Sequence, residues 1–559
     1  MDTQRLILFF VFGFSVLMLW DAWEKDHRPK PAPQAQASSA TTVPASPAKP
    51  AAAPAGAAPA TAPASAGSVP GAVAPAAKGE IIVVRTDLVV AEIDTLGATL
   101  RQVELLKHKE AKGSEKNLLL LGSEHRYQAQ SGLTGDSGPN HRTLWKAQPG
   151  SFELADGQDS LEVRFIGQGA DGLAVTKIYR FSRDSYVIDV AFEIKNGGGT
   201  AVAPATYFQL THDGKSSAAA NAVASTFGAQ SFNGFAVYTE EKKFQKVELT
   251  DVEKGKADYV KQANEGWLAF VQHYFVAGWI PPAKAARSYE VLKRDDGLYA
   301  GYVRMPIGSI EPGASATVNV QLYAGPQEQR RLATVAPGFD LVVDYGWLTI
   351  IAWPLFWLLE KFHALSGNWG VAIILLTVSI KLVFFPLSAT SYKSMAKMKL
   401  ITPRMTKIRE MYENDRARMN QAMMELYKTE KINPLGGCFP ILVQIPVFIA
   451  LYWVLLAAIE LRHAPFMLWI QDLSALDPYY VLPILMTITM VIQTKLNPVP
   501  PDPVQAKVMQ FMPFIFSIFF FFFPAGLVLY WLVNNVLSIL QQWQIQRMFD
   551  RDKPAHAKR

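Results

Sequence analysis

Hydrophobic and polar positions change their spacing several times along the chain. Residues 6–23 form a short apolar run, and residues 29–78 are almost entirely Ala, Pro, Ser, Thr and Gly. From about residue 80 to residue 335 apolar and polar residues alternate, and after residue 345 long apolar runs dominate. Alternation is typical of strands with one buried face, whereas apolar runs of about 20 residues are typical of membrane-spanning helices. The pattern therefore predicts an anchor, a tether, a β domain and a membrane section, in that order.

The amino-terminal run, LILFFVFGFSVLMLWDAW, is similar to a signal peptide. No small-x-small cleavage site follows it, however, and the next residues are Asp-Ala-Trp-Glu-Lys-Asp. We therefore expect residues 1–26 to form an uncleaved signal anchor. Residues 27–78 cannot bury enough apolar surface to offset the chain entropy, so we expect a flexible linker there.

Residues 79–337 contain short alternating segments such as LEVRFIG, SYVIDVAFEIKN and ATVNVQLYAG. Turn signals, among them Asn-Gly-Gly-Gly, Asp-Asp-Gly and Glu-Pro-Gly, separate these segments. This arrangement predicts a large antiparallel β-sandwich. No metal-binding spacing, nucleophile motif or phosphate loop stands out within it. The neighbours His212 and Asp213 are far more often an ordinary loop pair than a catalytic site.

The composition, the net charge and the single cysteine restrict the class of protein to which the chain can belong. Hydrophobic residues make up 50% of the 559-residue chain and charged residues only 18%, fewer than in a typical soluble protein. The net charge of +6 suggests anionic lipid or nucleic acid as partners. The single cysteine, Cys438, has no cysteine partner and no evident His and acid partners. We therefore expect a membrane protein that is not an enzyme and that needs no metal or cofactor.

The membrane section begins with DYGWLTIIAWPLFWLLEKFHAL, which Pro354 interrupts. Its Trp, Lys and His residues suit the membrane interface, so we expect an interfacial amphipathic helix within residues 338–366. A true membrane span is the alternative, and it would invert the predicted orientation of every later span across the membrane. Within the core, residues 367–546, the apolar runs predict five further spans, at 368–388, 437–459, 479–494, 508–523 and 524–545. The last two share one nearly unbroken apolar stretch, with a predicted hinge at Pro524-Ala525-Gly526.

The distribution of positive charge orients these spans. Residues 391–434 carry ten Lys and Arg against five Asp and Glu, and the basic tail 547–559 carries five against two. The loop 460–478 carries only Arg462 against three acidic residues. Because cytoplasmic loops carry the excess of Lys and Arg, both termini are predicted to be cytoplasmic. The fold class expected is a polytopic α-helical membrane protein with six spans and a large periplasmic β domain.

Lys381 lies inside the apolar run AIILLTVSIKLVFFPL. It is about thirteen residues, or roughly 20 Å, from the outer end of its span. A charge near mid-bilayer costs about 2.5–3.5 kcal/mol, so it normally faces protein or water. A lysine that snorkels to the inner headgroups is the alternative. Thr377, at position i−4, shares the same helix face.

Other polar residues interrupt the later spans. Tyr530, Asn534, Ser538 and Gln541 fall on one helical stripe. Gln444 lies in the middle of its span, and Gln493 lies near an inner end. Such faces have no partners in lipid, so they favour a shared wet groove, although hydrogen bonds that merely join a helix bundle are the alternative. The candidate groove residues are Lys381, Thr377, Gln444, Gln493, Tyr530, Trp531, Asn534 and Ser538.

The segment 391–434 predicts a cytoplasmic hairpin of two helices, at roughly 392–413 and 415–430. It contains seven of the sixteen methionines. Methionine suits a surface that meets many different apolar segments, while packing within the hairpin is the alternative. Interleaved Lys and Arg would attract lipid headgroups or ribosomal RNA. The candidate contact residues for a substrate are Met395, Met398, Met405, Met419, Met423 and Met424.

Several motifs together carry a resemblance to a known family. YKSMAKMKLITPRM, MMELYKTEKINPLGGCFPILVQIPVFIALYWVL, APFMLWIQDLSALDPYYVLPILM and FFPAGLVLYWLVNN closely resemble the YidC/Oxa/Alb family of membrane protein insertases. The long β domain behind an anchor resembles the Gram-negative form of that family. The strong motifs cover about residues 368–545, and order and spacing agree over the whole chain.

The resemblance implies more than the residues do by themselves. It implies a hydrophilic groove that opens to the cytoplasm and to lipid, and a periplasmic β-supersandwich similar to sugar-binding folds. It also implies action alone or with the Sec translocon. At the position that matches Lys381 the family usually has arginine. Lysine keeps the positive charge but loses the planar fork that binds a carboxylate with two bonds.

We therefore expect an insertase of the bacterial inner membrane. Its expected partners are nascent membrane proteins, the Sec translocon, the ribosome and anionic membrane lipids, with no small-molecule substrate. The alternative is an ion- or solute-coupled transporter, but the paired internal repeats of such proteins are not evident. A membrane-anchored carbohydrate-processing enzyme is a third hypothesis, and it would need a convergent acid pair in the β domain.

Overall fold

The fold is that of a computed structural model, and the structure describes residues 78–135, 138–215, 232–413, 415–430, 439–497 and 503–551. Contacts divide the chain into two units, and the sites discussed below lie in the unit formed by residues 66–498 and 512–559. The predicted anchor, almost all of the predicted linker, Cys438 and most of the basic tail lie outside the described residues.

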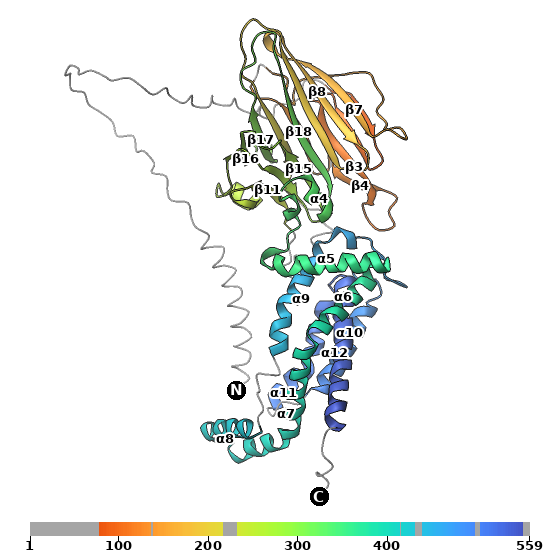
Figure 1. The fold of residues 1–559 in the computed structure, drawn as a ribbon, viewed down its shortest axis with the longest axis vertical. Helices are drawn as coiled ribbons and strands as arrows, with labels where there is room; N and C mark the ends of the chain where they lie inside the picture. The colour runs from red at the N-terminus through yellow and green to blue at the C-terminus, as the bar shows by residue number, and fades with distance from the viewer. Residues whose placement is uncertain are drawn as a thin grey trace, which may run out of the picture. The chain divides into compact units, whose positions relative to one another are not determined.

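The β domain consists of two antiparallel sheets of nine strands each (Figure 1). The first sheet has the order β1-β2-β3-β5-β10-β17-β16-β13, and β4 pairs with β3. Its strands are β1 (Ile81–Arg85), β2 (Val89–Asp94), β3 (Thr99–Lys109), β4 (Asn117–Leu121), β5 (Gln128–Leu133), β10 (Ala205–His212), β13 (Gln262–Ala263), β16 (Arg287–Lys293) and β17 (Tyr299–Pro306).

The second sheet has the order β12-β11-β14-β15-β18-β9-β8-β7-β6. Neighbouring strands are antiparallel here too, so the predicted antiparallel β-sandwich is confirmed. Its strands are β6 (Lys146–Ala147), β7 (Ser160–Gln168), β8 (Leu173–Ser182), β9 (Val187–Asn196), β11 (Gly234–Thr239), β12 (Lys243–Val247), β14 (Trp267–Val271), β15 (Phe275–Ile280) and β18 (Ser315–Pro326).

The core of the β domain is built from alternating residues of both sheets. In β9 every second side chain is buried. This period of two is expected because successive side chains of a strand point to opposite faces of the sheet, and here one face packs in the core. Phe192 of β9 and Trp279 of β15 both contact the ring of Phe208 on β10, with ring centroids 5.9 and 5.1 Å apart. These contacts join the two sheets, and the burial of large aromatic surfaces stabilises the domain.

Because two histidines of the β domain are buried, we predict that its free energy of unfolding is lower in acid than at neutral pH. Burial lowers the pKa of His212 and of His141 from 6.5 to about 4. Below pH 6.5 the unfolded chain binds protons that the folded domain does not, so stability falls as the pH drops from about 6.5 to about 4. The loss reaches about 3 kcal/mol for each group at the lower limit. Urea denaturation of the detergent-solubilised chain, followed by tryptophan fluorescence, measures it.

The variant His212→Leu provides the control for this pH dependence. It removes one titrating group, so its free energy of unfolding should decline less steeply between pH 6.5 and 4 than that of the parent chain. Parallel declines in both proteins would contradict the assignment to His212.

Two short helices, η1 (Ala170–Gly172) and α3 (Leu249–Glu253), lie within the β domain, and α4 (Gln329–Val335), η3 (Phe339–Val342) and η4 (Gly346–Leu348) connect it to the membrane section. A further short helix, η6 (Ile459–Leu461), comes later in the chain. The long helices are α5 (Thr349–Ser366), α6 (Trp369–Val383), α7 (Phe385–Met411), α8 (Arg416–Thr429), α9 (Phe439–Ala457), α10 (Val481–Leu496), α11 (Pro503–Phe520) and α12 (Ala525–Arg551).

The apolar helices coincide with the predicted spans but do not establish six of them. By length and composition one described helix, Gly346–Ser366, can cross a membrane, and the bent pair α6 and α7 passes the same test together. The apolar stretches Val443–Ala457, Val481–Leu496 and Ala506–Phe520 are shorter. Helix α5 lies across α6 and α9 in Figure 1, and it contacts both. That arrangement agrees with an interfacial helix, and the number of spans remains a prediction.

The helix boundaries follow local signals in the sequence. The Asn368 side chain accepts a hydrogen bond from the backbone N–H of Val371 at 3.1 Å, which caps the start of α6. Helices α6 and α7 meet at a bend of 66°. The predicted hinge at Pro524-Ala525-Gly526 separates α11 from α12, and the N–H of Gly526 donates to the carbonyl of Leu473 at 2.9 Å.

These restraints place α12 beside α6, α7, α9 and α10, and this arrangement positions the candidate site.

Candidate functional site

Lys381 lies in the last turn of α6 and points at α12. Its Nζ donates a hydrogen bond to Oγ of Ser538 at 2.8 Å, and the residue is only 7% exposed. This contact fixes the ammonium group against a neighbouring helix, which argues against the snorkelling alternative. Among the described residues no Asp or Glu forms an ion pair with it. Within the described part of the chain, Lys381 is therefore a buried basic group with no carboxylate partner.

Hydrogen bonds extend from Lys381 to two further helices. The Ser538 hydroxyl donates to the carbonyl of Asn534 at 2.7 Å, which orients its oxygen as an acceptor for Lys381. The Asn534 Oδ1 accepts from Nε2 of Gln444 on α9 at 2.9 Å. We call Lys381, Ser538, Asn534 and Gln444 the polar cluster. It joins α6, α9 and α12 at one level of the bundle.

The other candidate groove residues are placed differently. The Thr377 hydroxyl donates to the carbonyl of Ile373 in its own helix at 2.7 Å, and the residue is buried. Tyr530 is buried beside Gln444, one helical turn before Asn534. Gln493 is half-buried on α10 and makes no hydrogen bond with the polar cluster. Tyr530 therefore adjoins the cluster, and Gln493 does not.

Aromatic rings lie one turn from the polar cluster. Trp531 of α12 contacts Phe448 of α9 and Phe520 of α11, with ring centroids 4.5 and 4.6 Å apart. Its Nε1 is buried without a hydrogen-bond partner. Tyr452 of α9 contacts Phe523 at 6.0 Å. Because Phe448 follows Gln444 by one helical turn, these rings form an apolar layer next to the polar cluster.

Three residues of this region were missed by the reading of the sequence. Tyr392, in the first half of α7, lies beside Ser538. Asn535 is buried, and its amide donates to the sulfur of Met486 at 3.4 Å. Gln542 is also buried and donates to the carbonyl of Leu496 at 3.3 Å. Asn535 and Gln542 stand inside an apolar run, which was a usable signal, whereas Tyr392 lies outside every apolar run.

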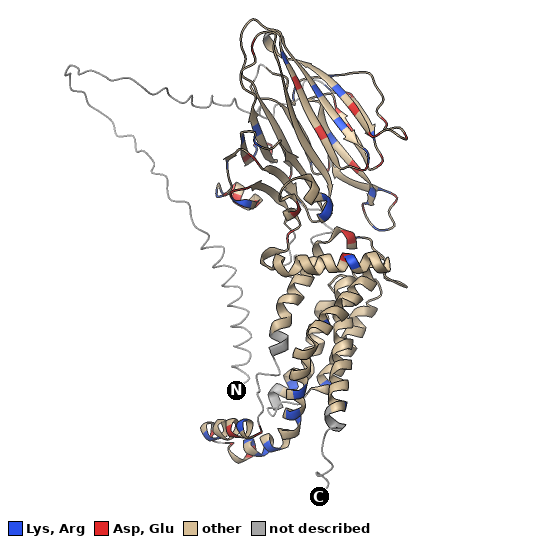
Figure 2. Cartoon of the chain, in the orientation of Figure 1, with Lys and Arg blue, Asp and Glu red and all other residues tan. Residues whose placement is uncertain are grey.

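The hairpin methionines divide into packed and exposed residues. Met405 is buried with Ile401, and Met398 and Met423 pack against this small core. Met424 is 55% exposed, while Met395 and Met419 are half-buried. The alternative of packing within the hairpin therefore describes three of the six candidates. Basic side chains lie along α7 and α8, and α9, α10 and α12 carry few charges between their ends (Figure 2).

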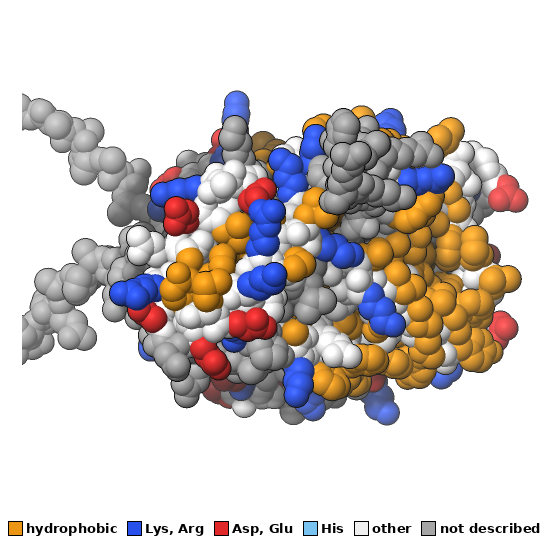
Figure 3. Space-filling view, turned by 90° about the horizontal axis from the view of Figure 1, so that it is seen from below, with side chains coloured by type: hydrophobic (Ala, Val, Ile, Leu, Met, Phe, Trp, Pro, Cys, Tyr) orange, Lys and Arg blue, Asp and Glu red, His pale blue; other side chains and the backbone are white. Residues whose placement is uncertain are grey.

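The face of the molecule seen from below combines hydrophobic and basic side chains (Figure 3). Exposed residues of the hairpin include Leu400 and Met411, at 54% and 69%. Such a surface can contact both apolar segments and anionic groups.

A histidine pair in the β domain is the described cluster with the geometry closest to a metal site. His125, His212 and Asp213 place their ligand atoms within 4.8 Å of one another. However, Nδ1 of His212 accepts a hydrogen bond from the N–H of Gly214 at 2.9 Å. This bond occupies the lone pair that a metal or a proton would need, and the ring stacks on Phe270. We conclude that His212 and Asp213 stabilise the loop through these contacts and do not form a metal or catalytic site.

Two family descriptions match the chain side by side. "YidC periplasmic domain" matches residues 81–358, and "60Kd inner membrane protein" matches residues 361–553. The first match includes the β domain and part of α5, and the second includes the polar cluster.

Curated relatives match over nearly the whole chain. The membrane protein insertase YidC of Nitrosospira multiformis is 53% identical, covering 98% of this chain and 98% of that protein. The YidC of Methylobacillus flagellatus is 51% identical, covering 99% of this chain and 98% of that protein. Among solved structures, an active YidC insertase covers 83% of this chain and 94% of its own, at 18% identity and a TM-score of 0.38. These relatives are named insertases, so they support neither the transporter nor the carbohydrate-processing alternative.

Proposed function

Since the chain belongs to the YidC family of membrane protein insertases, we propose that it inserts its clients through the polar cluster around Lys381. The family places it in the bacterial inner membrane, with a periplasmic domain and nascent membrane proteins as clients. The observation that carries the proposal is the contact of Lys381 with Ser538, because it holds a basic group, unpaired with any described carboxylate, among apolar helices. A buried charge without a partner is costly, and its retention favours a role in binding an anionic group.

The polar cluster lowers the barrier for a hydrophilic tail. Moving peptide groups from water into hydrocarbon without hydrogen bonds costs several kcal/mol for each group. In our mechanism a polar tail exchanges hydrogen bonds with Gln444, Asn534 and Ser538 as it enters, so only part of its path is dry. The apolar segment that follows leaves sideways into lipid. No covalent chemistry is involved.

The charge of Lys381 selects acidic tails. Coulomb attraction between unit charges 4 Å apart is about 4 kcal/mol at an effective dielectric constant of 20. The membrane potential adds about 2.3 kcal/mol per charge per 100 mV and pulls an acidic tail outward. Lysine attracts a carboxylate as a point charge, whereas arginine would bind it with two bonds. We therefore propose attraction rather than tight capture.

The hairpin of α7 and α8 makes the first contact with a nascent chain, chiefly through Met395, Met419 and Met424, which its own core leaves accessible. Its lysines and arginines bind anionic lipid headgroups or ribosomal RNA. Both termini are cytoplasmic, six helices span the bilayer, and larger clients are passed on from the Sec translocon.

Crosslinking of a stalled nascent membrane protein tests the path. A photo-reactive residue at position 444 or 531 should crosslink to the client, since position 444 belongs to the polar cluster and position 531 lies one turn from it. A probe at Val83, which is 47% exposed on β1, should not. Gel mobility and mass spectrometry of the products provide the measurement.

The proposed path would be contradicted by crosslinks that appear at position 83 and at exposed helix positions but never at 444 or 531. That result would still be compatible with membership of the insertase family.

A further inference from the structure

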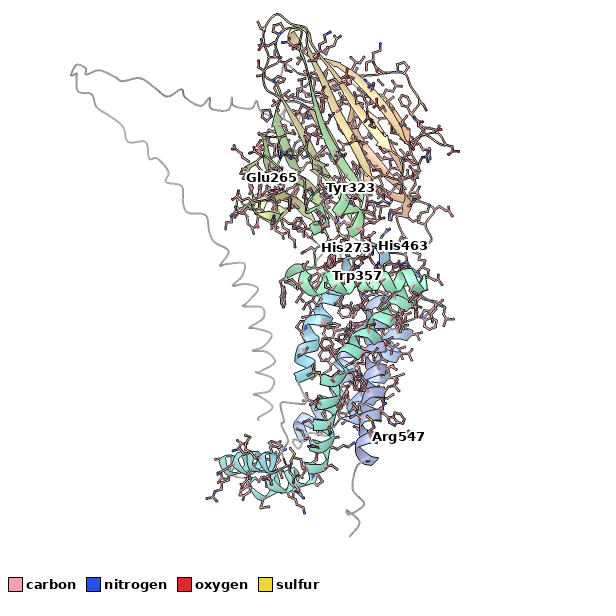
Figure 4. All side chains as sticks on the ribbon, in the orientation of Figure 1. Glu265, His273, Tyr323, Trp357, His463 and Arg547 are labelled. Carbon is pink, nitrogen blue, oxygen red and sulfur yellow. The ribbon has the colours of Figure 1, made fainter. Side chains whose placement is uncertain are left out.

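Two residues fasten the β domain to segments of the membrane section that lie far away in the sequence. Nε2 of His273, in the turn between β14 and β15, lies 3.0 Å from the carbonyl oxygen of Leu456 near the end of α9 (His273 is labelled in Figure 4). Nη2 of Arg462, which follows η6, donates to the carbonyls of Lys109 and Glu110 at the end of β3, at 2.8 and 2.9 Å. All these residues belong to the same compact unit of the chain. We call the two contacts the latch.

The His273 contact satisfies a backbone group that α9 leaves unpaired. The last four carbonyls of a helix have no partner within it, and the carbonyl of Leu456 is one of them because α9 ends at Ala457. A carbonyl can only accept, so Nε2 of His273 carries the hydrogen. Nδ1 of the same ring is buried and has no hydrogen-bond partner among the described residues. The neutral ring therefore fits the contact, whereas a second proton, on Nδ1, would have no acceptor.

Arg462 makes the surroundings of the His273 ring electropositive. Its guanidinium lies 5.6 Å from the centroid of the Phe275 ring, and no carboxylate in the described chain forms an ion pair with it. His108 packs edge-on against the same Phe275 ring at 5.6 Å, and burial, followed by the charge of Arg462, lowers the pKa of His108 to about 4. Burial also lowers the pKa of His273. The bond to Leu456 opposes this shift in part, and Arg462 adds to it.

The acidic groups of this region have other neighbours. The basic and titratable residues around the latch are Lys107, His108, Lys112, Tyr274, Arg331 and His463. The acidic ones are Glu110, which is exposed, Asp184, which forms ion pairs with Lys107 and Arg331, and Asp472, which lies 3.9 Å from Nε2 of His463. A proton on His273 would therefore place a charge in a half-buried site without a counter-charge, which is costly.

A separate contact holds the covalent connection between the β domain and α5. Nη2 of Arg330 in α4 lies 2.8 Å from Oε2 of Glu360 in α5. Glu460 of η6 lies near this pair, and burial, together with the charges of Glu328 and Glu360, raises its pKa to about 7. Opening of the latch would leave the connection intact, so the domain would swing about residues 336–348. A small polar interface between domains permits such motion.

We propose that His273 and Arg462 form an acid-sensitive latch between the β domain and the carboxyl-terminal end of α9. At neutral pH the uncharged His273 ring caps α9 and the latch is closed. In acid the ring gains a proton that no acceptor or counter-charge compensates, so the ring leaves its site and the latch opens. The pKa of His273 is lower in the closed state than in the open state, so opening is favoured as the pH falls below about 6.5.

The latch also bears on the membrane section. Helix α9 carries Gln444 of the polar cluster, twelve residues or about 18 Å from Leu456. A closed latch therefore fixes the end of a helix that supplies one member of the cluster. The latch itself does not depend on the proposed route of insertion.

Distance measurements on the full chain in phosphatidylcholine nanodiscs test the proposal. Spin labels are attached after Lys195→Cys, on exposed β9, and Leu365→Cys, 80% exposed on α5, in a chain that also carries Cys438→Ser. Pulsed electron paramagnetic resonance should give one narrow distance distribution at pH 7.5. At pH 5.0 a second population should appear. The ratio of open to closed molecules should rise by up to about thirtyfold, which is the advantage that a released histidine of pKa 6.5 gains at that pH.

Substitutions around the latch should give distinct results. His273→Gln keeps a donor for α9 but does not titrate, so this variant should stay closed at pH 5.0. His273→Ala and Arg462→Leu remove donors, and each should show the open population already at pH 7.5. Glu460→Gln removes a neighbouring group that also titrates between these pH values, and it should respond to pH like the parent chain.

A second pair of labels separates opening from unfolding. Labels at Lys195 and at Val83, which is 47% exposed on β1, both lie on the β domain and should keep one distance at pH 5.0. His125→Gln changes a histidine of the β domain outside the latch and should leave the response of the first pair unchanged.

The proposal is overturned if the parent chain keeps its narrow distribution at pH 5.0, or if His273→Gln opens as the parent does. It is also overturned if Glu460→Gln or His125→Gln abolishes the response, or if His273→Ala and Arg462→Leu both stay closed. A change in the distance within the β domain that accompanies the response would assign the response to unfolding and would overturn the proposal too.

Discussion

Replacing Lys381 with alanine is expected to slow the insertion of acidic-tailed clients by about tenfold or more. The charge attracts the tail when it has left bulk water, where electrostatic interactions are least screened. A loss of about 1.4 kcal/mol in the rate-limiting step is sufficient for a tenfold effect. The measurement is the rate at which a client's tail becomes protected from protease in reconstituted vesicles that carry a membrane potential.

Three comparisons separate the charge from other effects of this substitution. Lys381→Arg keeps the charge and should retain most of the rate. Lys361→Ala removes a cation from α5, where Nζ lies 5.7 Å from the ring of Trp357, and should have little effect. The insertion rate of a client with an uncharged tail should not change in the Lys381→Ala variant. Equal slowing of acidic and uncharged clients would mean that Lys381 only supports the bundle.

Replacing Lys177 with alanine is expected to destabilise the β domain by about 3–5 kcal/mol. Lys177 lies on β8 and is fully buried between the sheets, and no Asp or Glu in the described chain pairs with it. Its Nζ donates to the carbonyls of Gly97, Ala98 and Ser131 at 3.3, 2.8 and 3.3 Å. Burial lowers the pKa of Lys177, but three carbonyl acceptors and the face of the Tyr179 ring favour the ammonium form.

Alanine would leave a cavity and remove the donor that three buried carbonyls share. The melting temperature of the β domain should fall by about 10 °C, measured by tryptophan fluorescence of the full chain in detergent. Lys177→Met fills the volume without restoring the donor, so an intermediate loss is expected. Lys195→Ala is the control, because Lys195 is exposed on the adjacent β9. A melting temperature within 2 °C of the parent for Lys177→Ala would refute the structural role of the ammonium group.

The fold was predictable where burial imposes a regular period. The alternation in SYVIDVAFEIKN became β9, and the alternation in ATVNVQLYAG became most of β18. The break at Pro524-Ala525-Gly526 separated α11 from α12 as expected. Strand order was not predictable, because β9 pairs with β18 over a separation of more than one hundred residues. Local spacing carries no information about which distant strand completes a ladder.

The sequence predicted which residues belong to the candidate site better than it predicted which of them contact one another. A lysine in an apolar run, together with amides and hydroxyls in other runs, marked Lys381, Gln444, Asn534 and Ser538. The sequence could not exclude Gln493, which makes no hydrogen bond with them, or indicate Tyr392, which lies beside Ser538. Helical period places residues on a face, but the crossing of two helices decides which faces meet.

The sequence by itself determined which segments form a β domain and which form apolar helices. It also determined that a lysine, Lys381, lies within one of the apolar helices, and it carried the family motifs. These follow from the cost of exposing apolar surface and burying charge, which each residue carries wherever it lies. Tertiary structure alone decided that Ser538 of α12 accepts a hydrogen bond from Lys381 of α6, and that Gln444 of α9 donates one to Asn534 of α12. Those outcomes depend on the packing of segments far apart in the chain, where small differences between large packing energies select a single arrangement.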